Sequence, residues 1–384
     1  MSLRSNSIQL SVIKQMELLA ARHVDVVSLA QGIPSFDTPL PVKRRAENAL
    51  REGIVAKYSL SPGLPELREM IEASLAREGI FYDWQKEIII TAGSIEGITA
   101  SLLALTDPGD EVIIPDPTYT SYREAVRLAG CVPVFVPLSE EEGWGFTLEK
   151  FKAAITSKTK VIFYCNPNNP TGTVYSREEL LSLGELAEAH DLFLISDEAY
   201  KDCLFDEAPY ISLAQFSKFR RRLIRIFTFS KTYAMTGWRL GYVNAEESIA
   251  REIMKVHDTL VTCAPVISQY AAMGALEAGD ESIRYFRGHY QKRRDAMCAC
   301  FDQLSNYLSY VKPQAAYFVF PKIKGCTDSL ALAKDILEKV KLALVPGVAF
   351  GPAGEGHLRF SFGREEKDIH EGMKRFEKYC RNYL

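Results

Sequence analysis

The sequence lacks the patterns that mark a membrane protein or a disulfide-stabilised protein. No apolar run approaches the roughly 18 to 20 residues that cross a bilayer. The eight cysteines are scattered and form no C-x-x-C pair, which favours a thiol-reducing cytoplasm. The first seven residues carry no apolar core behind their charge, so we expect no signal peptide.

The chain is also poor in histidine and nearly balanced in charge. Its six histidines show no H-x-x-x-H spacing, and we expect no zinc site. Lysine and arginine number 46 against 49 acidic residues, whereas a dedicated nucleic-acid binder is usually basic. The basic run 218–222 and the pair Arg293–Arg294 are therefore interpreted as solvated turns, and Cys298 and Cys300 as ordinary helix packing. No repeat or low-complexity tract is present, which excludes solenoids and propellers.

What the 384 residues do show is an alternation of short apolar runs with helical patterns between 88 and 243. Near-continuous apolar runs separated by helices predict an α/β domain with a mostly parallel sheet between helices. A helical stretch over 281–307 then leads to a smaller α+β region, with strands predicted at 316–320 and 358–362 and a helix at 329–340. Ligands of such sheets bind at the carboxyl ends of the strands.

These patterns predict a division of the chain into three parts. Residues 1–44 form an arm and part of the small domain, 45–285 form the large domain, and 286–384 form the small carboxyl-terminal domain. The first 41 residues include Pro34, Pro39 and Pro41. Because proline disfavours helix interiors, we expect the arm to be extended.

Two candidate ligand-binding loops follow predicted strands. The segment 91–97, which contains Gly93, leads into a helical pattern. Glycine lets a ligand approach the backbone, and free amides at a helix start favour an anion such as phosphate. The segment 166–172, Asn-Pro-Asn-Asn-Pro-Thr-Gly, places three asparagines at another strand end. Each also has a plain interpretation, as a strand-to-helix turn and as an irregular capping loop.

Charged residues follow two further strands. Asp197 and Glu198 end a buried apolar run, and such a pair is either a helix N-cap or includes a carboxylate that holds a cationic ring nitrogen. Lys231 follows the apolar run 223–227. A lysine there is costly to bury unless it has a chemical role or a carboxylate partner. Surface exposure is the alternative for either site taken alone.

Considered together, these residues point to one ligand. Asn169, Asp197, Tyr200, Lys231 and Arg239 all follow buried strands of one predicted sheet, and we expect them to converge at one edge. These residue types suit an aromatic aldehyde that carries a ring nitrogen to protonate, a phenolic oxygen and a phosphate. The sequence therefore predicts a site for pyridoxal 5′-phosphate (PLP), held as a Schiff base on a lysine.

The same residues resemble a known family, the class I and II aminotransferases of the aspartate aminotransferase fold. The most specific motifs are Asn-Pro-Asn-Asn-Pro-Thr-Gly at 166–172, Ser-Asp-Glu-Ala-Tyr at 196–200 and Ser-Lys-Thr-Tyr-Ala-Met-Thr-Gly-Trp-Arg-Leu-Gly-Tyr at 230–242. Their order and spacing agree with the family, and the resemblance runs from Gly32 to Arg359.

The resemblance implies roles for residues around the cofactor. Lys231 would form the Schiff base and shuttle the proton, and Asp197 would pair with the pyridine nitrogen. Tyr200 and Asn169 would hydrogen-bond the phenolic oxygen, and Tyr119 would stack on the ring. The implied catalytic residues are Lys231, Asp197 and Tyr200. The residues implied for the phosphate end are Gly93, Ser94, Ile95, Thr228, Ser230 and Arg239.

The resemblance also implies a substrate site and a second subunit. Arg359 would grip the substrate α-carboxylate, a bidentate task that lysine performs poorly. Gly32, on the arm, and Asn169 would complete that carboxylate site. Tyr58 would reach the phosphate of the neighbouring subunit, so the resemblance implies a homodimer.

Two departures from the family pattern bear on the substrate. Residues 315–318 read Ala-Ala-Tyr-Phe where the family often has Gly-Ala-Phe-Tyr. Ile95 stands where some aspartate-using relatives carry a lysine. A wall of Ile33, Tyr119 and Tyr122 then favours aromatic or medium apolar amino acids, with 2-oxoglutarate as acceptor, in a ping-pong transamination.

Three other functions are alternatives to this prediction: an aspartate aminotransferase, a lyase or synthase, and a ligand sensor. Because 2-oxoglutarate is dicarboxylic, some cation must reach the pocket, either Arg22 from the arm or a residue of the other subunit. The same cation would admit aspartate, so an aspartate aminotransferase is one alternative. A lyase or synthase on the same fold shares the same residues. A ligand sensor with an appended helix-turn-helix is disfavoured, because the residues before Gly32 leave no room for one.

Overall fold

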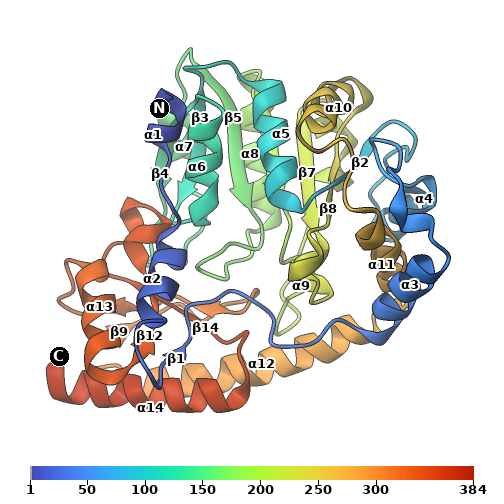
Figure 1. Ribbon diagram of the computed structural model, residues 1–384. Helices are drawn as coiled ribbons and strands as arrows, with labels where there is room; N and C mark the ends of the chain where they lie inside the picture. Colours follow the sequence, from blue (N-terminus) through green and yellow to red (C-terminus); the bar gives the residue numbers. More distant parts are fainter. Residues whose placement is uncertain (1) are drawn as a thin grey trace.

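A seven-stranded sheet forms the centre of the structure, a computed structural model that describes residues 2–384 (Figure 1). Its strands are β2 (Ile88–Thr91), β3 (Glu111–Asp116), β4 (Val132–Pro137), β5 (Thr159–Cys165), β6 (Phe193–Asp197), β7 (Leu223–Thr228) and β8 (Gly241–Asn244). They lie in the order β2-β8-β7-β6-β5-β3-β4. Strands from β7 to β4 are parallel, and β8 is antiparallel to both its neighbours. The prediction of a mostly parallel sheet is confirmed.

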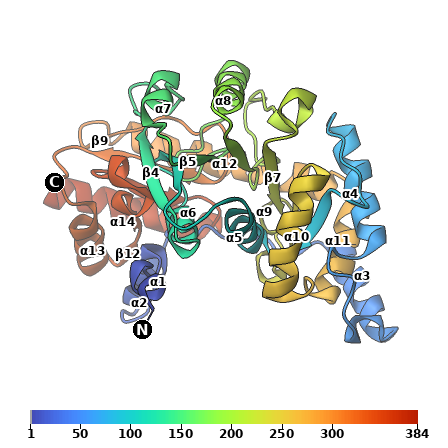
Figure 2. The ribbon, with the colours of Figure 1, turned by 90° about the horizontal axis from the view of Figure 1, so that it is seen from above.

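Helices bury the strands on both faces. They are α3 (Leu40–Arg51), α4 (Pro65–Arg77), α5 (Ser94–Leu105), α6 (Thr120–Leu128), α7 (Leu148–Ala154), α8 (Arg177–Ala189), α9 (Phe229–Thr232), α10 (Glu247–Val261) and α11 (Val266–Glu277). Figure 2 shows α5, α6 and α10 on one face of the sheet and α7 and α8 on the other. Every residue of β2, β7 and β8 is buried. The strand ends are therefore the part of the sheet that a ligand can reach.

A smaller unit of short strands and helices lies beside the carboxyl ends of the sheet (Figure 1). It contains β1 (Val27–Ser28), β9 (Leu308–Ser309), β10 (Phe318–Val319), β11 (Lys322–Ile323), β12 (Leu342–Ala343), β13 (Val345–Pro346), β14 (Leu358–Ser361), α13 (Ser329–Val340) and α14 (Glu366–Tyr383). The long helix α12 (Glu281–Asp302) connects it to the large unit. Strand β1 pairs with β12, so the amino-terminal arm is part of this unit.

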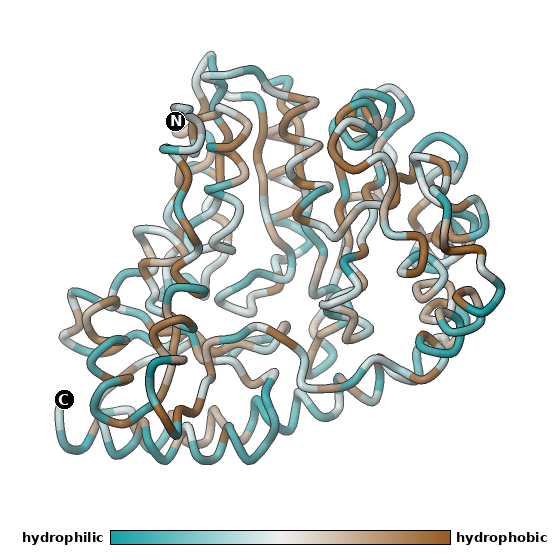
Figure 3. The backbone as a smooth tube through the Cα atoms, in the orientation of Figure 1, coloured by the Kyte–Doolittle hydropathy of each residue, from teal (hydrophilic) through white to brown (hydrophobic). Residues whose placement is uncertain are grey.

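Apolar residues concentrate where the elements meet (Figure 3). One large buried apolar cluster extends from the sheet into the small unit, and a second lies among β2, α4 and α11. The outer faces of α12 and α14 are hydrophilic (Figure 3). Within residues 2–384, no helix is both long enough and apolar enough to cross a membrane.

The prediction of an extended arm is wrong for its first half. The arm contains two helices, α1 (Leu3–Ser7) and α2 (Val12–Ala20). The prolines on which the prediction rested all lie at or after position 34, so none interrupts these helices. Met16 on α2 is fully buried, and its burial anchors the helix against the rest of the molecule.

The prediction of a solvated turn at Arg293 and Arg294 is also wrong. Both residues lie on α12, and they are 8% and 0% exposed. The Arg294 guanidinium lies 2.7 Å from Asp206 Oδ2 and 2.7 Å from Asp295 Oδ1. Two carboxylates thus compensate a buried charge that composition alone assigned to the surface.

Candidate active site

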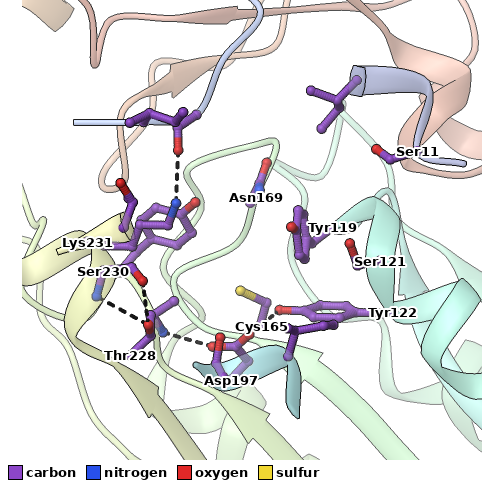
Figure 4. A pocket seen from close by; sticks show the side chains of 18 of the residues that line it. Ser11, Tyr119, Ser121, Tyr122, Cys165, Asn169, Asp197, Thr228, Ser230 and Lys231 are labelled. Atoms are coloured by element: carbon purple, nitrogen blue, oxygen red, sulfur yellow. Dashed lines mark hydrogen bonds between the residues drawn. The ribbon is translucent and has the colours of Figure 1, made fainter. Parts of the chain in front are cut away.

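The carboxyl ends of three adjacent strands form the floor of a cavity of about 510 Å³. Cys165 ends β5, Asp197 ends β6 and Thr228 ends β7. Figure 4 shows these side chains with Lys231 and the other labelled residues around one space. The arm and the small unit supply the remaining walls. The cavity is therefore where a parallel sheet offers polar side chains and loop backbone to a ligand.

Most of the predicted site residues line this cavity. They are Gly32, Ser94, Ile95, Tyr119, Asn169, Asp197, Tyr200, Thr228, Ser230, Lys231, Arg239 and Arg359. Gly93 lies directly against the Arg239 guanidinium. Tyr58 is 84% exposed and lies outside the cavity.

Lys231 has the properties of a nucleophile. Its Nζ donates to the Gly32 carbonyl oxygen at 2.9 Å (Figure 4), and no carboxylate of residues 2–384 lies within ion-pair distance of it. Burial and the positive charge of Arg359 lower the pKa of Lys231 to about 8. A substantial fraction of the amine is then neutral near pH 7 to 8, which is the form that attacks a carbonyl.

Asp197 is a buried carboxylate held by two donors. Tyr122 Oη donates to Asp197 Oδ2 at 2.7 Å, and the Ala199 amide donates to Oδ1 at 3.0 Å (Figure 4). Burial raises the pKa of Asp197 to about 6, and both hydrogen bonds act against that rise. Tyr122 lines the cavity as predicted, but its hydroxyl supports Asp197 rather than forming a purely apolar wall.

The adjacent Glu198 has a different partner. Glu198 Oε2 accepts a hydrogen bond from Arg225 Nε at 2.6 Å, and these side chains are 1% and 0% exposed. Arg225 also donates to Asn244 Oδ1 at 3.1 Å. Asp197 is the last residue of β6, and Glu198 directly follows the strand. The acidic pair therefore divides into a cavity carboxylate, Asp197, and one half of a buried ion pair.

Further ion pairs extend this second cluster. Lys201 Nζ lies 2.8 Å from Glu78 Oε1 and 3.0 Å from Asp202 Oδ1. Arg225 Nη2 lies 3.9 Å from Glu78 Oε2. We call this cluster the Arg225 network; its members are Glu78, Glu198, Lys201, Asp202 and Arg225.

The cavity contains an anion-binding cradle. Helix α5 begins at Ser94, and the first amides of a helix have no intrahelical partner. Arg239 Nη2 lies 2.6 Å from the position that a Cβ would take on residue 93. Gly93, with φ at +84°, leaves the space that the guanidinium needs. Free amides and a guanidinium are the donors that suit a phosphate.

Arg359 is 1% exposed and has a free donor. Its Nη1 donates to Asn169 Oδ1 at 3.1 Å and its Nη2 to the Ala30 carbonyl at 2.5 Å. The rings of Phe318 and Phe350 lie 4.2 and 4.9 Å from its Cζ. Its Nε has no partner in the part of the chain that the structure describes. Burial lowers the pKa of Arg359 to about 10, so it remains charged at neutral pH and suits a carboxylate.

The loop that carries Tyr58 is connected to the cradle through His257. The His257 Nε2 atom lies 3.0 Å from the Ser61 carbonyl oxygen, and its Nδ1 lies 3.1 Å from Glu96 Oε1. Glu96 Oε2 in turn accepts from the Ala92 amide at 3.2 Å, just before α5. A buried histidine thus fixes the Tyr58 loop relative to the predicted phosphate site.

Sequence reasoning missed the wall that helix α2 contributes. Ser11, Lys14 and Glu17 line the cavity, and their spacing of three places them on one helix face. That signal was present in the sequence, but the prediction of an extended arm obscured it. Arg22, the cation expected from the arm, is exposed and is absent from the cavity lining among residues 2–384. Other lining residues that were not predicted are Ile13, Gln31, Ile98, Ser121, Cys165, Ala199, Thr236 and Phe318.

Comparison with known proteins agrees with this geometry. The family described as Aminotransferase class I and II matches residues 24–376. The chain is 38% identical to an aspartate aminotransferase of Pyrococcus abyssi, over 99% of this chain and 98% of that one. It is 35% identical to aromatic-amino-acid aminotransferase 2 of Thermococcus litoralis, over 96% and 95%. The structure of an aspartate aminotransferase from Thermus thermophilus with maleate superposes with a TM-score of 0.93 at 34% identity, covering 98% of this chain and 99% of that one. Because the matched region includes the whole central sheet and most of the cavity lining, the chain belongs to the class I and II aminotransferases.

Proposed function

We propose that this aminotransferase moves the α-amino group of aromatic or medium-sized apolar L-amino acids to 2-oxoglutarate, in a ping-pong reaction with PLP. The observation that carries the proposal is the meeting of Lys231, Asp197 and Arg359 in one cavity. A lyase or synthase on the same fold is not favoured, because the relatives described above are named aminotransferases.

The donor set of the cavity fits PLP. The Arg239 guanidinium beside Gly93 and the start of α5 suit its phosphate, and Asp197 is a buried carboxylate that can hold a protonated ring nitrogen. When bound, PLP supplies an electron-accepting ring that stabilises the charge left as the substrate loses its α-proton. The residues that we propose to hold it are Ser94, Ile95, Tyr119, Asn169, Asp197, Tyr200, Thr228, Ser230, Lys231 and Arg239.

Lys231 is the proposed point of covalent attachment and the proposed base. Its lowered pKa supports both roles, because a neutral amine is needed to attack a carbonyl and to accept the proton of the substrate α-carbon. Asp197 keeps a proton on the ring nitrogen, and Tyr122 holds Asp197 in place. Tyr200, which is buried, and Asn169 orient the phenolic oxygen.

Arg359 is the proposed grip for the substrate α-carboxylate. Its orphaned Nε and its contact with Asn169 support this role, as does the neighbouring backbone of Gly32. Around the substrate side chain, Ile33 and Tyr119 line the cavity and favour an apolar or aromatic group. Maleate, with which the Thermus enzyme was solved, is a dicarboxylate, and this supports a dicarboxylic acceptor on the same fold.

We also propose that two copies of the chain form the working dimer, with Tyr58 reaching the phosphate of the other subunit. Tyr58 lies in a segment with several exposed apolar side chains, and such surfaces mark protein contacts. The exposed apolar residues of this segment are Leu40, Leu50, Ile54, Tyr58 and Leu60. Sedimentation velocity tests this, and a fully active monomer at assay concentration contradicts it.

Two further proposals concern the cell and the domains. All eight cysteines are unpaired thiols, which supports a reducing cytoplasmic compartment. The proposed limits are 1–44 for the arm and part of the small domain, 45–285 for the large domain and 286–384 for the small carboxyl-terminal domain. The last boundary lies within α12, so that helix would connect the two domains as one rigid rod.

The test is a spectral titration of the PLP-loaded enzyme. Aspartate, phenylalanine, tyrosine, leucine and alanine are added singly, and bleaching of the visible band of the pyridoxal form reports amino-group transfer. Return of the band on adding 2-oxoglutarate identifies the acceptor. The proposal expects the aromatic amino acids and leucine to lead. Aspartate ahead by about a hundredfold in specificity constant, about 2.7 kcal/mol, makes the enzyme an aspartate aminotransferase instead.

A further inference from the structure

Among the side chains that the structure describes, four cationic ones line the cavity, and three of them have proposed roles. They are Lys14, Lys231, Arg239 and Arg359. Lys231 is proposed to attach the cofactor, Arg239 to bind its phosphate and Arg359 to bind the substrate α-carboxylate. Lys14, on α2, remains without a role, and any role in substrate binding rests on the proposed transamination with 2-oxoglutarate.

The side chains of Lys14 and Glu17 carry the two charges on the cavity face of α2. Across residues 2–384, neither the Lys14 ammonium nor the Glu17 carboxylate makes a hydrogen bond or an ion pair. The two residues are three positions apart on one helix, where side chains are neighbours. The charge of Glu17 also acts on Arg359, raising its pKa against the larger opposite effect of burial. Glu17 is therefore close enough to influence a bound carboxylate.

The face that carries these charges is held in place over the cavity. Ser11 Oγ lies 3.4 Å from Thr120 Oγ1 at the start of α6. The Gln9 amide donates to Glu124 Oε2 at 3.0 Å, and Met16 is fully buried on the other side of the helix. The amino-terminal end of α2 is thus tied to α6 and its opposite face is held by Met16, so the side chain of Lys14 is the part that has to move to meet a ligand.

A dicarboxylic acceptor needs such a cation. The cavity lining also includes the apolar residues Ile33, Ile95 and Ile98, and a carboxylate enclosed beside them without a partner is strongly disfavoured. A lysine has a flexible four-carbon stem and a compact charge. It can meet a distal carboxylate and can turn to solvent when the substrate carries an aromatic ring.

We propose that Lys14 binds the distal carboxylate of dicarboxylic substrates, while Glu17 opposes it, so that helix α2 sets the balance between dicarboxylic and apolar substrates. The two charges then act with opposite sign on the same ligand. Lys14 has no effect on a substrate that lacks a distal charge, whereas Glu17, whose charge also acts on Arg359, opposes the binding of both carboxylates.

Binding of unreactive ligands tests the proposal without turnover. Glutarate is a five-carbon dicarboxylate, and pentanoate is the monocarboxylate of equal length. Calorimetric titration of the PLP-loaded enzyme compares wild type with Lys14→Met, Lys14→Arg, Glu17→Gln and the control Arg22→Met.

Loss of a charge-assisted hydrogen bond predicts that Lys14→Met binds glutarate about tenfold more weakly. Lys14→Arg retains most of the affinity, and Glu17→Gln binds glutarate more tightly. Arg22→Met matches wild type, because Arg22 is equally basic and on the same arm but outside the cavity. Pentanoate binding is the same in wild type, Lys14→Met, Lys14→Arg and Arg22→Met. In Glu17→Gln, pentanoate gains affinity through Arg359 but gains less than glutarate does, so the ratio of glutarate to pentanoate affinity rises.

Steady-state kinetics supply the second readout. Lys14→Met raises KM for 2-oxoglutarate about tenfold while KM for phenylalanine is unchanged. Equal glutarate affinity in wild type and Lys14→Met overturns the proposal. A parallel loss of pentanoate affinity also overturns it, since the lysine would then act on the α-carboxylate. If the wild type transaminates no acceptor, the proposed function fails, but the glutarate and pentanoate pair still reports on Lys14 independently.

Discussion

Two groups of buried charge meet at the end of β6, where Asp197 belongs to one group and the next residue, Glu198, to the other. The two groups differ in how their charges are compensated. In the Arg225 network, Glu198 and Arg225 are 2.6 Å apart. In the cavity, Asp197, Lys231 and Arg359 have no ion-pair partner among residues 2–384. Burial shifts each cavity group toward its neutral form, with pKa values of about 6 for Asp197, about 8 for Lys231 and about 10 for Arg359.

The network shows the opposite response to the same burial. Burial acts to lower the pKa of Arg225, but Glu198 and further neighbours raise it above the ordinary value. The pKa of Lys201 is likewise raised by Asp202 and Glu78 against the effect of burial. A buried charge that is paired stabilises its own ionised form, whereas an unpaired one is available to a ligand. The direction of the pKa shifts therefore distinguishes the Arg225 network, a structural cluster, from the cavity groups, which are available for reaction. This distinction needs no comparison with a related protein.

The largest expected effect comes from Lys231→Ala. Turnover falls about 10⁴-fold or more, because the nucleophile and the base are both lost. The unfolding free energy changes little, since no ion pair is broken. The matched variant Lys201→Ala should do the reverse, losing stability while the folded fraction keeps its kcat. Initial rates and urea unfolding of both variants check this, and equal stability losses in the two contradict the comparison.

Arg225→Met tests the network directly. It leaves the Glu198 carboxylate buried without its partner, and we expect a loss of about 3 to 5 kcal/mol in unfolding free energy. The double variant Arg225→Met/Glu198→Gln should recover part of that loss. Urea titration gives the energies. If the single variant unfolds like wild type, the pair is not the stabilising element that its geometry indicates.

Asp197→Asn removes the charge but keeps the shape of the side chain. We expect kcat to fall about a hundredfold, with little change in KM for the amino acid, because the carboxylate acts on charge that develops during the chemical step. Stopped-flow measurement of the first half-reaction isolates this step. A change confined to KM would mean that Asp197 is only a cap for the following turn.

The lowered pKa of Lys231 predicts how fast the cofactor-free enzyme captures PLP. The neutral fraction of a lysine with a pKa of about 8 rises about tenfold between pH 7 and pH 9, and the capture rate should rise with it. Since the positive charge of Arg359 helps to lower this pKa, Arg359→Gln should move the midpoint to higher pH. Rapid-mixing absorbance against pH measures both. A pH-independent rate contradicts the assignment.

The smallest effect is expected from Tyr122→Phe. The Tyr122 hydroxyl lowers the pKa of Asp197 against the effect of burial, so its loss raises that pKa and protonates more of the carboxylate. Activity should fall about three- to tenfold at pH 7, and the deficit should shrink as pH rises. A pH–rate profile with the same deficit at pH 6 and pH 8 would show that the hydroxyl acts by packing alone.

The strand-end residues could be predicted because the topology of a parallel sheet is simple. Successive strands deliver their carboxyl ends to one edge, so the convergence of Asp197, Thr228 and Lys231 follows from the order of apolar runs. Helix α13 was predicted with the bounds found, 329–340, because its apolar residues repeat at helical spacing. These features depend on local pattern, which a single sequence contains.

Features that depend on packing between distant segments could not be predicted. The Tyr122–Asp197 hydrogen bond joins residues 75 positions apart, and Arg225 lies in a run that is otherwise apolar, where its partner Glu198 is not evident. The place of α2 depends on the burial of Met16 under the rest of the fold. Lys14 was therefore invisible as a cavity residue, although its spacing from Ser11 and Glu17 was regular.

The order in which the chain is made has a consequence for when the cavity exists. Arg359 and Ala30 are 329 positions apart and share a hydrogen bond of 2.5 Å, and the carbonyl of Gly32 accepts from both Lys231 and Tyr317. A growing polypeptide can form the central sheet while Arg359 has not yet been synthesised. Full closure of the cavity must therefore wait for nearly the whole chain, and proteolytic loss of either end would return the enzyme to that unfinished state.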